Sequence, residues 1–366
     1  MKFYPVSFAA QLGLIVASSL MNTPAHSAPP SKDWVVLDSL PDPIGYAGMA
    51  AGVLGGRLVA TGGSQWSQPV WLKGTRKFND EIFVLGGLDQ TWQVASARLP
   101  VASGHFASAA TDQAMYFAGG THAGGCLATA YELRPEGSSY VTRRLADLPK
   151  PIGYAAGAIV GGRFFLIGGV PDPSSTQPSN EVWSLDLSSP AARWEREADL
   201  PGPGLLVPAA SSSGTSVFAF GGMAFDDAGK PVPSAAAYHL PKAGGVWERL
   251  PDLPQPRVGI NTPCPVLPDG TIWLIGGYAE VWGGAQREHP GFAEQTYFYN
   301  IARRTWTTGP KLPNVGAGDR DVSGDAGPVP TIGAPVVVWR NHVTVVGGEV
   351  RISTRTPAVI AWPLSR

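Results

Sequence analysis

The feature that most constrains this chain is a double glycine that recurs at the end of short apolar runs. Runs of this kind are typical of buried β-strands, and glycine lets the chain leave a crowded strand and turn. A motif repeated along the chain indicates a repeat architecture, so six pairs predict six units. The pairs occur in LVATGG (Gly62, Gly63), MYFAGG (Gly119, Gly120), FFLIGG (Gly168, Gly169), VFAFGG (Gly221, Gly222), IWLIGG (Gly276, Gly277) and VTVVGG (Gly347, Gly348).

Each unit carries further strands around its double glycine. A small-residue strand comes before it, as in GYAAGAIV, and a third strand comes after it, as in DEIFVL or NEVWSLDL. A tryptophan and a Leu-Pro pair then often follow, at Trp92, Trp194, Trp247 and Trp306. Four short strands per unit, with turn residues between them, predict the blade of a β-propeller. We therefore expect an all-β, six-bladed β-propeller.

This pattern resembles the kelch repeat over nearly all of residues 33–366. The resemblance implies that the tryptophans pack between blades and that Leu-Pro caps each outer strand. Most of the repeated residues are then structural.

The two ends of the repeat region predict how the ring closes. Segment 33–41, DWVVLDSLP, reads as a fourth strand with no first three strands before it. Segment 356–364, TPAVIAWPL, reads as a third strand with no fourth after it. The N-terminal strand should therefore complete the last blade and remove exposed sheet edges. Cys126 and Cys264 then fall in blades 2 and 5, on opposite sides of the ring, and both thiols should be free.

Residues 1–28 predict a secretory signal peptide, cleaved after Ser27 or Ala28, with the propeller domain at residues 29–366. The apolar stretch in residues 1–28 is short for a membrane span, and no later segment approaches that length. We therefore expect a soluble mature protein that is exported to the periplasm. A formal charge of −1 gives no basic stripe for nucleic acid.

One face of the propeller is expected to carry the chemistry. If the strands of a blade are named a to d from axis to rim, all b–c and d–a loops lie on one face. The long loops 64–79, 278–294 and 313–333 belong to blades 1, 5 and 6, and long loops on a rigid scaffold often carry function. They predict one pocket walled by these three blades. The residues after the double glycines ring the axis there, five neutral and one acidic: Ser64, Thr121, Val170, Met223, Tyr278 and Glu349.

The segment GGEVRISTRTPAV (347–359) resembles the Gly-Glu and Arg-Thr motif of the N-acetylneuraminate epimerases, which are periplasmic six-bladed kelch propellers. The blades containing ATGGSQWSQPVWLKGTRKFNDEIFVL and AGGTHAGGCLATA resemble the blades that follow in that family. Here the glutamate blade comes last, as in a cyclically permuted branch.

The resemblance implies a mutarotase that needs no cofactor and acts on a small-molecule sugar acid. It would interconvert the α and β anomers of N-acetylneuraminate (sialic acid) through the open-chain form. Glu349 would be the catalytic base, and Arg355 would hold the substrate carboxylate with two hydrogen bonds. The alternative is a Glu349–Arg355 salt bridge that only ties down a loop. In either case we expect an exposed ion pair, which contributes about 0–1 kcal/mol to stability.

Other residues on this face are weaker candidates for substrate binding. Arg76 and Lys77 could contact an anion, and Tyr46, His105 and Tyr154 open strand a and could touch a sugar. His105 and His122 lack a third ligand, so no metal site is expected.

Two other functions remain open. One is a non-catalytic exported kelch propeller that binds a carbohydrate or a protein. The other is a different carbohydrate enzyme. PDGTIW (268–273) resembles part of a sialidase Asp-box, but it occurs once and lacks the leading Ser, and the Cys–Tyr ligand set of a copper oxidase is not found.

Overall fold

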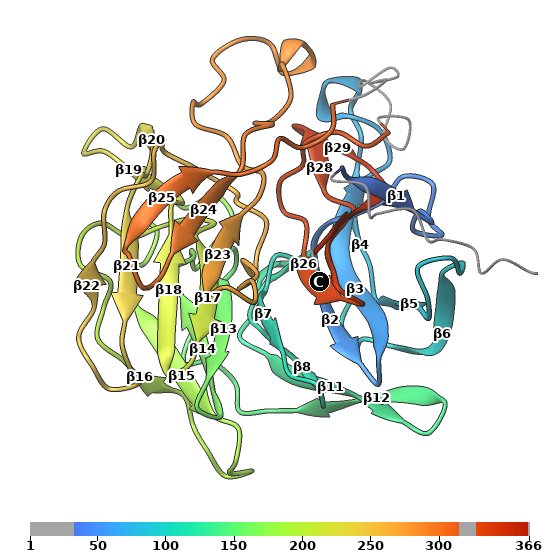
Figure 1. Ribbon diagram of the computed structural model, residues 1–366, viewed down its shortest axis with the longest axis horizontal. Helices are drawn as coiled ribbons and strands as arrows, with labels where there is room; N and C mark the ends of the chain where they lie inside the picture. The colour runs from blue at the N-terminus through green and yellow to red at the C-terminus, as the bar shows by residue number, and fades with distance from the viewer. Residues whose placement is uncertain (1–32, 315–326, 365–366) are drawn as a thin grey trace, which may run out of the picture. The chain divides into compact units, whose positions relative to one another are not determined.

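Six antiparallel β-sheets follow one another along the chain and form the six blades of a β-propeller in the computed structural model (Figure 1). Residues 33–314 and 327–364 are described, and residues 32–366 form one compact unit. Strand makes up 43% and helix 2%, which confirms the all-β prediction. The predicted signal peptide lies outside the described residues. In the described part of the chain, no helix is long and apolar enough to cross a membrane.

The first three blades each contain four strands in the order a to d. Blade 1 consists of β2 (Ala47–Leu54), β3 (Arg57–Trp66), β5 (Glu81–Leu85) and β6 (Gln93–Arg98), with β4 (Arg76–Phe78) paired to the end of β3. Blade 2 consists of β7 (Ala107–Ala110), β8 (Met115–Ala118), β11 (Ala130–Glu136) and β12 (Ser139–Arg144). Blade 3 consists of β13 (Ala156–Val160), β14 (Arg163–Ile167), β15 (Val182–Asp186) and β16 (Glu195–Arg196).

The last three blades follow the same order. Blade 4 consists of β17 (Ala209–Ser213), β18 (Ser216–Phe220), β21 (Ala237–Leu240) and β22 (Glu248–Arg249). Blade 5 consists of β23 (Thr271–Leu274), β24 (Tyr297–Asn300) and β25 (Thr305–Thr308). Blade 6 consists of β26 (Val336–Trp339), β27 (His342–Val346), β30 (Val359–Pro363) and β1 (Val35–Leu37). The b–c loops add small hairpins and two short 3-10 helices: β9 (Thr121–His122) with β10 (Gly125–Cys126), β19 (Met223–Phe225) with β20 (Pro231–Pro233), β28 (Glu349–Arg351) with β29 (Thr354–Arg355), η1 (Val70–Leu72) and η2 (Gln286–Glu288).

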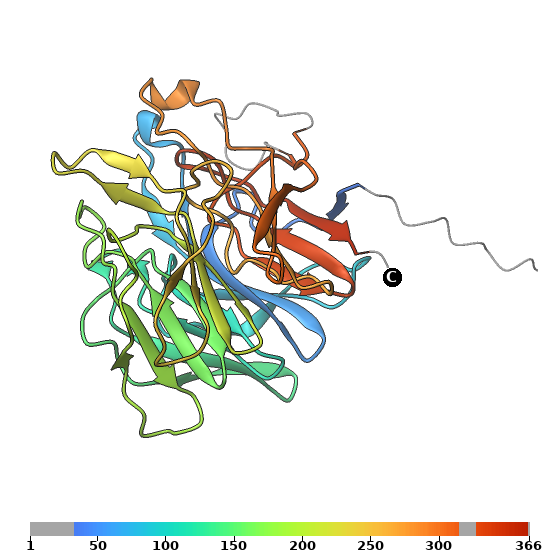
Figure 2. The same ribbon diagram turned by 60° about the vertical axis from the view of Figure 1, so that its left-hand side comes forward.

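The N-terminal strand closes the ring, as the sequence predicted. Strand β1 pairs with β30 in an antiparallel register that places Val35 opposite Ala361 and Leu37 opposite Val359. The blue β1 accordingly lies beside the red C-terminal strands in both ribbon views (Figures 1 and 2). Blade 6 therefore joins the two ends of the propeller domain, with β1 as its outer strand.

Blade 5 departs from the predicted four strands. Its inner segment forms only an isolated bridge, between Val266 and Ile272, in place of a regular strand a. Pro263 and Pro265 lie in this segment and have no N–H to donate, so a continuous ladder cannot form there. The N–H of Asn261 and the carbonyl of Pro265 still bond to the neighbouring strand region, at Ile275 and Trp273.

The double glycines join neighbouring blades. In five of the six pairs, the second glycine donates its N–H to a carbonyl that precedes strand a of the next blade, at N···O distances of 2.7–2.9 Å. The donor–acceptor pairs are Gly63–Ser103, Gly120–Ile152, Gly169–Leu205, Gly222–Arg257 and Gly348–Tyr46.

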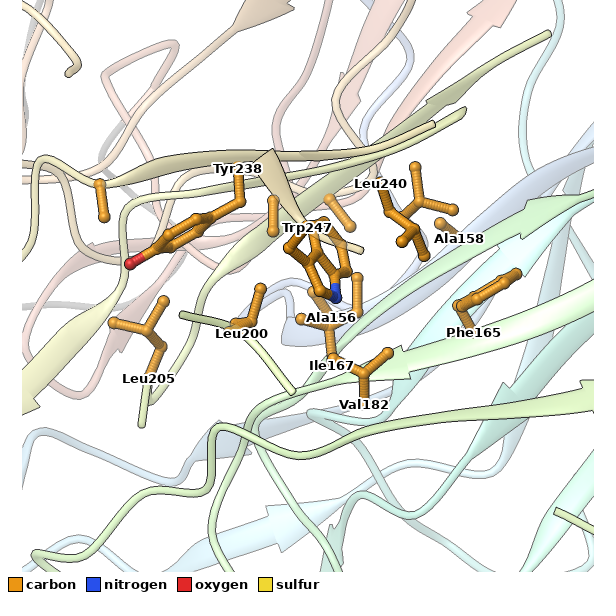
Figure 3. Packing of buried hydrophobic residues seen from close by; sticks show 14 of the residues in the cluster. Ala156, Ala158, Phe165, Ile167, Val182, Leu200, Leu205, Tyr238, Leu240 and Trp247 are labelled. Atoms are coloured by element: carbon orange, nitrogen blue, oxygen red, sulfur yellow. The ribbon is translucent and has the colours of Figure 1, made fainter. Parts of the chain in front are cut away.

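Tryptophans join the blades near the rim. Trp247 of blade 4 packs with Ala156 and Leu240 in the cluster between blades 3 and 4 (Figure 3), and its indole N–H donates to the carbonyl of Ala198 at 2.9 Å. The same bond to the preceding blade recurs at other interfaces and confirms that these tryptophans pack between blades. The other donors are Trp34, Trp92, Trp194 and Trp306.

The two cysteines are free, as predicted. Cys126 lies in β10 of blade 2 and Cys264 lies in the inner segment of blade 5. Burial raises the pKa of both thiols, to about 11 at Cys126, where the charge of Asp172 adds to the effect.

Gly119 gives a direct test of the contact between blades. An added Cβ would lie 2.1 Å from the carbonyl oxygen of Ile152, and φ is +65°. Gly137 has a similar φ of +59° but open space around its Cβ position. We expect Gly137→Ala to cost about 1–2 kcal/mol of unfolding free energy, and Gly119→Ala to cost clearly more. Denaturant unfolding measures both values, and equal costs would show that the close contact is unimportant.

Thiol labelling tests the placement of the cysteines. Without reductant, a thiol reagent should modify both cysteines in denaturant, and the native protein should react slowly because burial disfavours the thiolate. A protected pair in denaturant would contradict the free thiols.

Candidate active site

A ring of backbone in the left-handed conformation surrounds the propeller axis at the start of each strand a. Each blade contributes one residue with φ between +46° and +72°, and adjacent members are linked by N–H···O=C bonds from Gly48 to Gly333, His105 to Gly48, Tyr154 to His105 and Val207 to Tyr154. Three members are glycines and three carry side chains. The six positions are Gly48, His105, Tyr154, Val207, Gly259 and Gly333.

The residues after the double glycines lie directly beside this ring. Thr121, Val170, Met223, Tyr278 and Glu349 each form a bridge with the residue that precedes the ring position in their own blade, and Ser64 pairs likewise with Ala47. The six equivalent positions predicted from the sequence are therefore equivalent in the structure, on the face that carries the b–c and d–a loops.

A cavity of about 260 Å³ opens on this face. Residues of all six blades line it, so it lies on the axis and is not confined to blades 5, 6 and 1, as the loop lengths had suggested. The reason is geometric, because every blade contributes a ring residue. Most of the long connection 313–333 lies outside the described residues.

Glu349 and Arg355 face each other across the β28–β29 hairpin. The six-residue spacing in sequence makes them register partners, and Arg355 Nη1 lies 3.0 Å from Glu349 Oε1. The N–H of Ser353 donates to the same oxygen at 2.6 Å. Within residues 33–314 and 327–364, Oε2 accepts no hydrogen bond. Glu349 lines the cavity, so Oε2 is the oxygen available to a ligand.

The pair is not the exposed ion pair expected from the sequence. The Arg355 side chain is 3% exposed and that of Glu349 is 18% exposed. The cause is the hairpin, which folds Arg355 beneath the loops and lets its Nε donate to the carbonyl of Ser64 at 3.1 Å. Removing one partner of a buried pair leaves the other charge uncompensated, so the estimate for surface pairs does not apply here.

The long loops of blades 1 and 5 hold this hairpin from both sides. The N–H of Val70 in the blade 1 loop donates to Ser353 Oγ at 3.0 Å. On the other side, Arg351 Nη1 donates to the carbonyl of Arg287 in the blade 5 loop at 2.8 Å. These contacts fix the loop that carries Glu349.

Ser64 connects both arginines to the cavity side chains. Arg76 Nε donates to Ser64 Oγ at 3.1 Å, and Ser64 Oγ lies 3.0 Å from His105 Nε2. Arg76 Nη1 donates to the Tyr154 hydroxyl at 3.1 Å, and the rings of His105 and Tyr154 pack 4.8 Å apart. His105 and Tyr154 line the cavity, so the structure brings together Arg76, His105, Glu349 and Arg355 of the sequence-predicted residues.

The electrostatics of this cluster favour an anion. Burial and the charges of Arg76 and Arg355 lower the pKa of His105 well below its usual value, so the imidazole is neutral at pH 7. Burial also lowers the pKa of Arg355, while the charge of Glu349 opposes that shift.

The side of the cavity formed by blades 4 and 5 is apolar. Leu206, Val207 and Met223 come from blade 4, and Val258 and Ile260 from blade 5. The cavity thus has a polar side and an apolar side, which is the usual make-up of a small-molecule site.

Two predicted binding residues lie elsewhere. Tyr46 is buried two positions before Gly48, so it is not equivalent to His105 and Tyr154, and its hydroxyl donates to Asp42 Oδ2 at 3.0 Å. Lys77 is exposed on β4 and does not line the cavity. Among the described residues, no group of three or more His, Cys, Asp or Glu could hold a metal ion.

Tyr278 lines the cavity beside Glu349 but was not singled out from the sequence. Burial, and to a lesser extent the charge of Glu349, raises its pKa to about 12. Its position in the sequence could have identified it, because Tyr278 directly follows the double glycine of blade 5, as Glu349 follows that of blade 6.

The chain is similar to two curated proteins named N-acetylneuraminate epimerase, from Brucella suis and Brucella melitensis biotype 1. Each is 29% identical over 145 residues, which is 39% of this chain. The match spans only about a third of the relatives' length, at 35%. No family model matches the chain. These similarities agree with the resemblance noted from the sequence.

The neutral His105 predicts how stability depends on pH. Its pKa is lowered in the folded state, so its contribution is complete above the usual histidine pKa of about 6.5 and is lost as pH falls below that value. We expect His105→Gln to reduce the loss of unfolding free energy between pH 6.5 and 5.5 by up to about 1.4 kcal/mol. Equal slopes in the parent and the variant would mean that the pKa of His105 is the same in the folded and unfolded states.

Proposed function

We propose that this protein is a sugar-acid mutarotase that interconverts the anomers of N-acetylneuraminate. The observation that carries the proposal is Glu349, whose Oε2 is available in an axial cavity while its Oε1 is held by Ser353 and Arg355. A carboxylate fixed in this way can accept and return a proton.

The reaction needs such a group. Mutarotation opens the sugar ring when a base takes the proton of the anomeric hydroxyl, the bond from the anomeric carbon to the ring oxygen breaks, and the ring oxygen receives a proton. Rotation about the neighbouring carbon–carbon bond turns the other face of the carbonyl toward that oxygen. Closure in the reverse sense gives the other anomer. In this scheme Glu349 is the base in ring opening and returns the proton in ring closure.

The charges of the site suit a sugar acid. Arg355 fixes Glu349, and Arg355 and Arg76 together make this side of the cavity positive enough to attract a carboxylate. A direct contact between Arg355 and the carboxylate stays a prediction. The apolar side formed by Leu206, Val207 and Met223 can receive the C–H face of the ring and an acetyl methyl group.

The printed names of the two similar proteins support the choice of N-acetylneuraminate. Residues 1–28, with the features of a signal peptide, support periplasmic export as part of the same proposal. A non-catalytic carbohydrate-binding propeller is the competing function, because the same cavity could bind a sugar without changing it.

Anomer exchange in the Glu349→Gln variant tests the proposal. Proton NMR of freshly released N-acetylneuraminate should show faster equilibration of the anomers with the parent protein than without it. Glu349→Gln should lose this acceleration by about 100- to 10,000-fold, because an amide can still bond to Ser353 but cannot take the proton. Galactose, which has no carboxylate, should exchange at its spontaneous rate.

Glu280→Gln provides the matched control, since Glu280 is an exposed acid in the blade 5 loop on the same face. It should exchange anomers at the parent rate. Full activity in Glu349→Gln would remove Glu349 from the mechanism. A parent protein that binds N-acetylneuraminate in calorimetry without accelerating exchange would instead favour the binding propeller.

A further inference from the structure

Tyr278 and Glu349 take equivalent places beside the ring of left-handed residues, in neighbouring blades. Both residues directly follow the double glycine of their blades, Tyr278 in blade 5 and Glu349 in blade 6. The N–H and the carbonyl of Tyr278 both bond to Val258, at 3.0 and 2.9 Å, so its backbone is fixed. The aromatic ring packs against Phe292 with centroids 5.9 Å apart.

The hydroxyl of Tyr278 is free to serve a ligand. In the described part of the chain it makes no hydrogen bond, although the residue lines the cavity together with Glu349. Two other tyrosines of the ring region are engaged, since Tyr154 accepts from Arg76 and Tyr46 donates to Asp42. The Tyr278 side chain is half-buried at the cavity, so its hydroxyl is open to a partner in the ligand.

The proposed reaction needs two proton transfers, and Glu349 accounts for only one of them. Glu349 accepts the proton of the anomeric hydroxyl, but the ring oxygen must receive another when its bond to the anomeric carbon breaks. His105 is neutral and its Nε2 is engaged with Ser64, and the guanidinium groups of Arg76 and Arg355 are poor acids. Tyr154 and Tyr278 both line the cavity and both carry a phenolic proton. Tyr278 is the better candidate, because its residue takes the place equivalent to that of Glu349 in the neighbouring blade and its hydroxyl has no partner among the described residues, whereas the Tyr154 oxygen is held by Arg76.

We propose that Tyr278 is the second catalytic residue and donates its phenolic proton to the ring oxygen of the sugar. This inference rests on the proposed mutarotase function. In ring opening, Glu349 takes the hydroxyl proton, the C–O electron pair passes to the ring oxygen, and that oxygen takes the proton of Tyr278. In ring closure, the phenolate takes this proton back while Glu349 returns its own to the carbonyl oxygen.

The charge of Glu349 couples the two transfers. Burial and, to a lesser extent, the negative charge of Glu349 raise the pKa of Tyr278 to about 12, so the phenol stays protonated before substrate binds. When Glu349 accepts a proton, its charge is neutralised and phenolate formation becomes easier in the same step. The forming alkoxide is a stronger base than a phenolate, so the proton moves toward the sugar.

The test compares Tyr278→Phe with the parent by NMR anomer exchange and by calorimetric binding of N-acetylneuraminate. The variant keeps the ring against Phe292 and removes only the hydroxyl. We expect kcat to fall by about 100-fold or more while KM and the calorimetric Kd stay within about threefold of the parent. Tyr238→Phe deletes a hydroxyl that accepts from Arg249 in blade 4, and Tyr238 does not line the cavity, so this variant should behave as the parent.

Each result has a distinct meaning. A parent-like kcat in Tyr278→Phe would overturn the role of Tyr278 and leave the mutarotase function standing. An equal loss of binding and turnover would also overturn it, because a proton donor affects the chemical step. A parent protein without anomer exchange would overturn the mutarotase function and this role with it.

Discussion

The bond from the second glycine of a pair to the next blade, present at five of the six double glycines, is the interaction on which the rest of this structure depends. It draws the backbone of one blade against the entry of the following strand a, where an added Cβ would collide with a carbonyl oxygen at several of the pairs. The neighbouring ring of left-handed residues and the bridges beside it repeat from blade to blade around the axis. The side chains placed there, Glu349 and Tyr278 among them, therefore point from fixed backbone into one cavity.

Most of the fold could be predicted from the sequence because its determinants are local. The double glycines, the tryptophans and the split last blade are short patterns whose physical roles are the same in every unit. The errors came where a pattern had two possible alignments or a local breaker. IGYAG and IGYAA look alike, yet Gly48 and not Tyr46 matches Tyr154. In blade 5, two prolines remove the donors that a regular inner strand needs.

The site was only partly predictable, because a short sequence motif does not determine burial or the contacts between blades. The acid at one of six equivalent positions identified Glu349, and the six-residue spacing identified its partner across a hairpin. The sequence does not show that Arg355 is buried, because the group it bonds to, Ser64, lies in another blade. The sequence also does not show which tyrosine hydroxyls have partners. The hydroxyl of Tyr154 accepts from Arg76, whereas Tyr278 lines the cavity and its hydroxyl makes no hydrogen bond among the described residues.

The closure of the ring by β1 also sets when the site can form during folding. Arg355 and Ser64 are 291 positions apart, and their bond crosses the junction between blade 6 and blade 1. Contacts of such long sequence separation form late, because the loop entropy must be overcome before they contribute. A chain with only its first blades folded would lack the closed axial cavity. Glu349 and Arg355, which belong to blade 6, would not yet be in place. Competence for binding therefore depends on the closure of the ring.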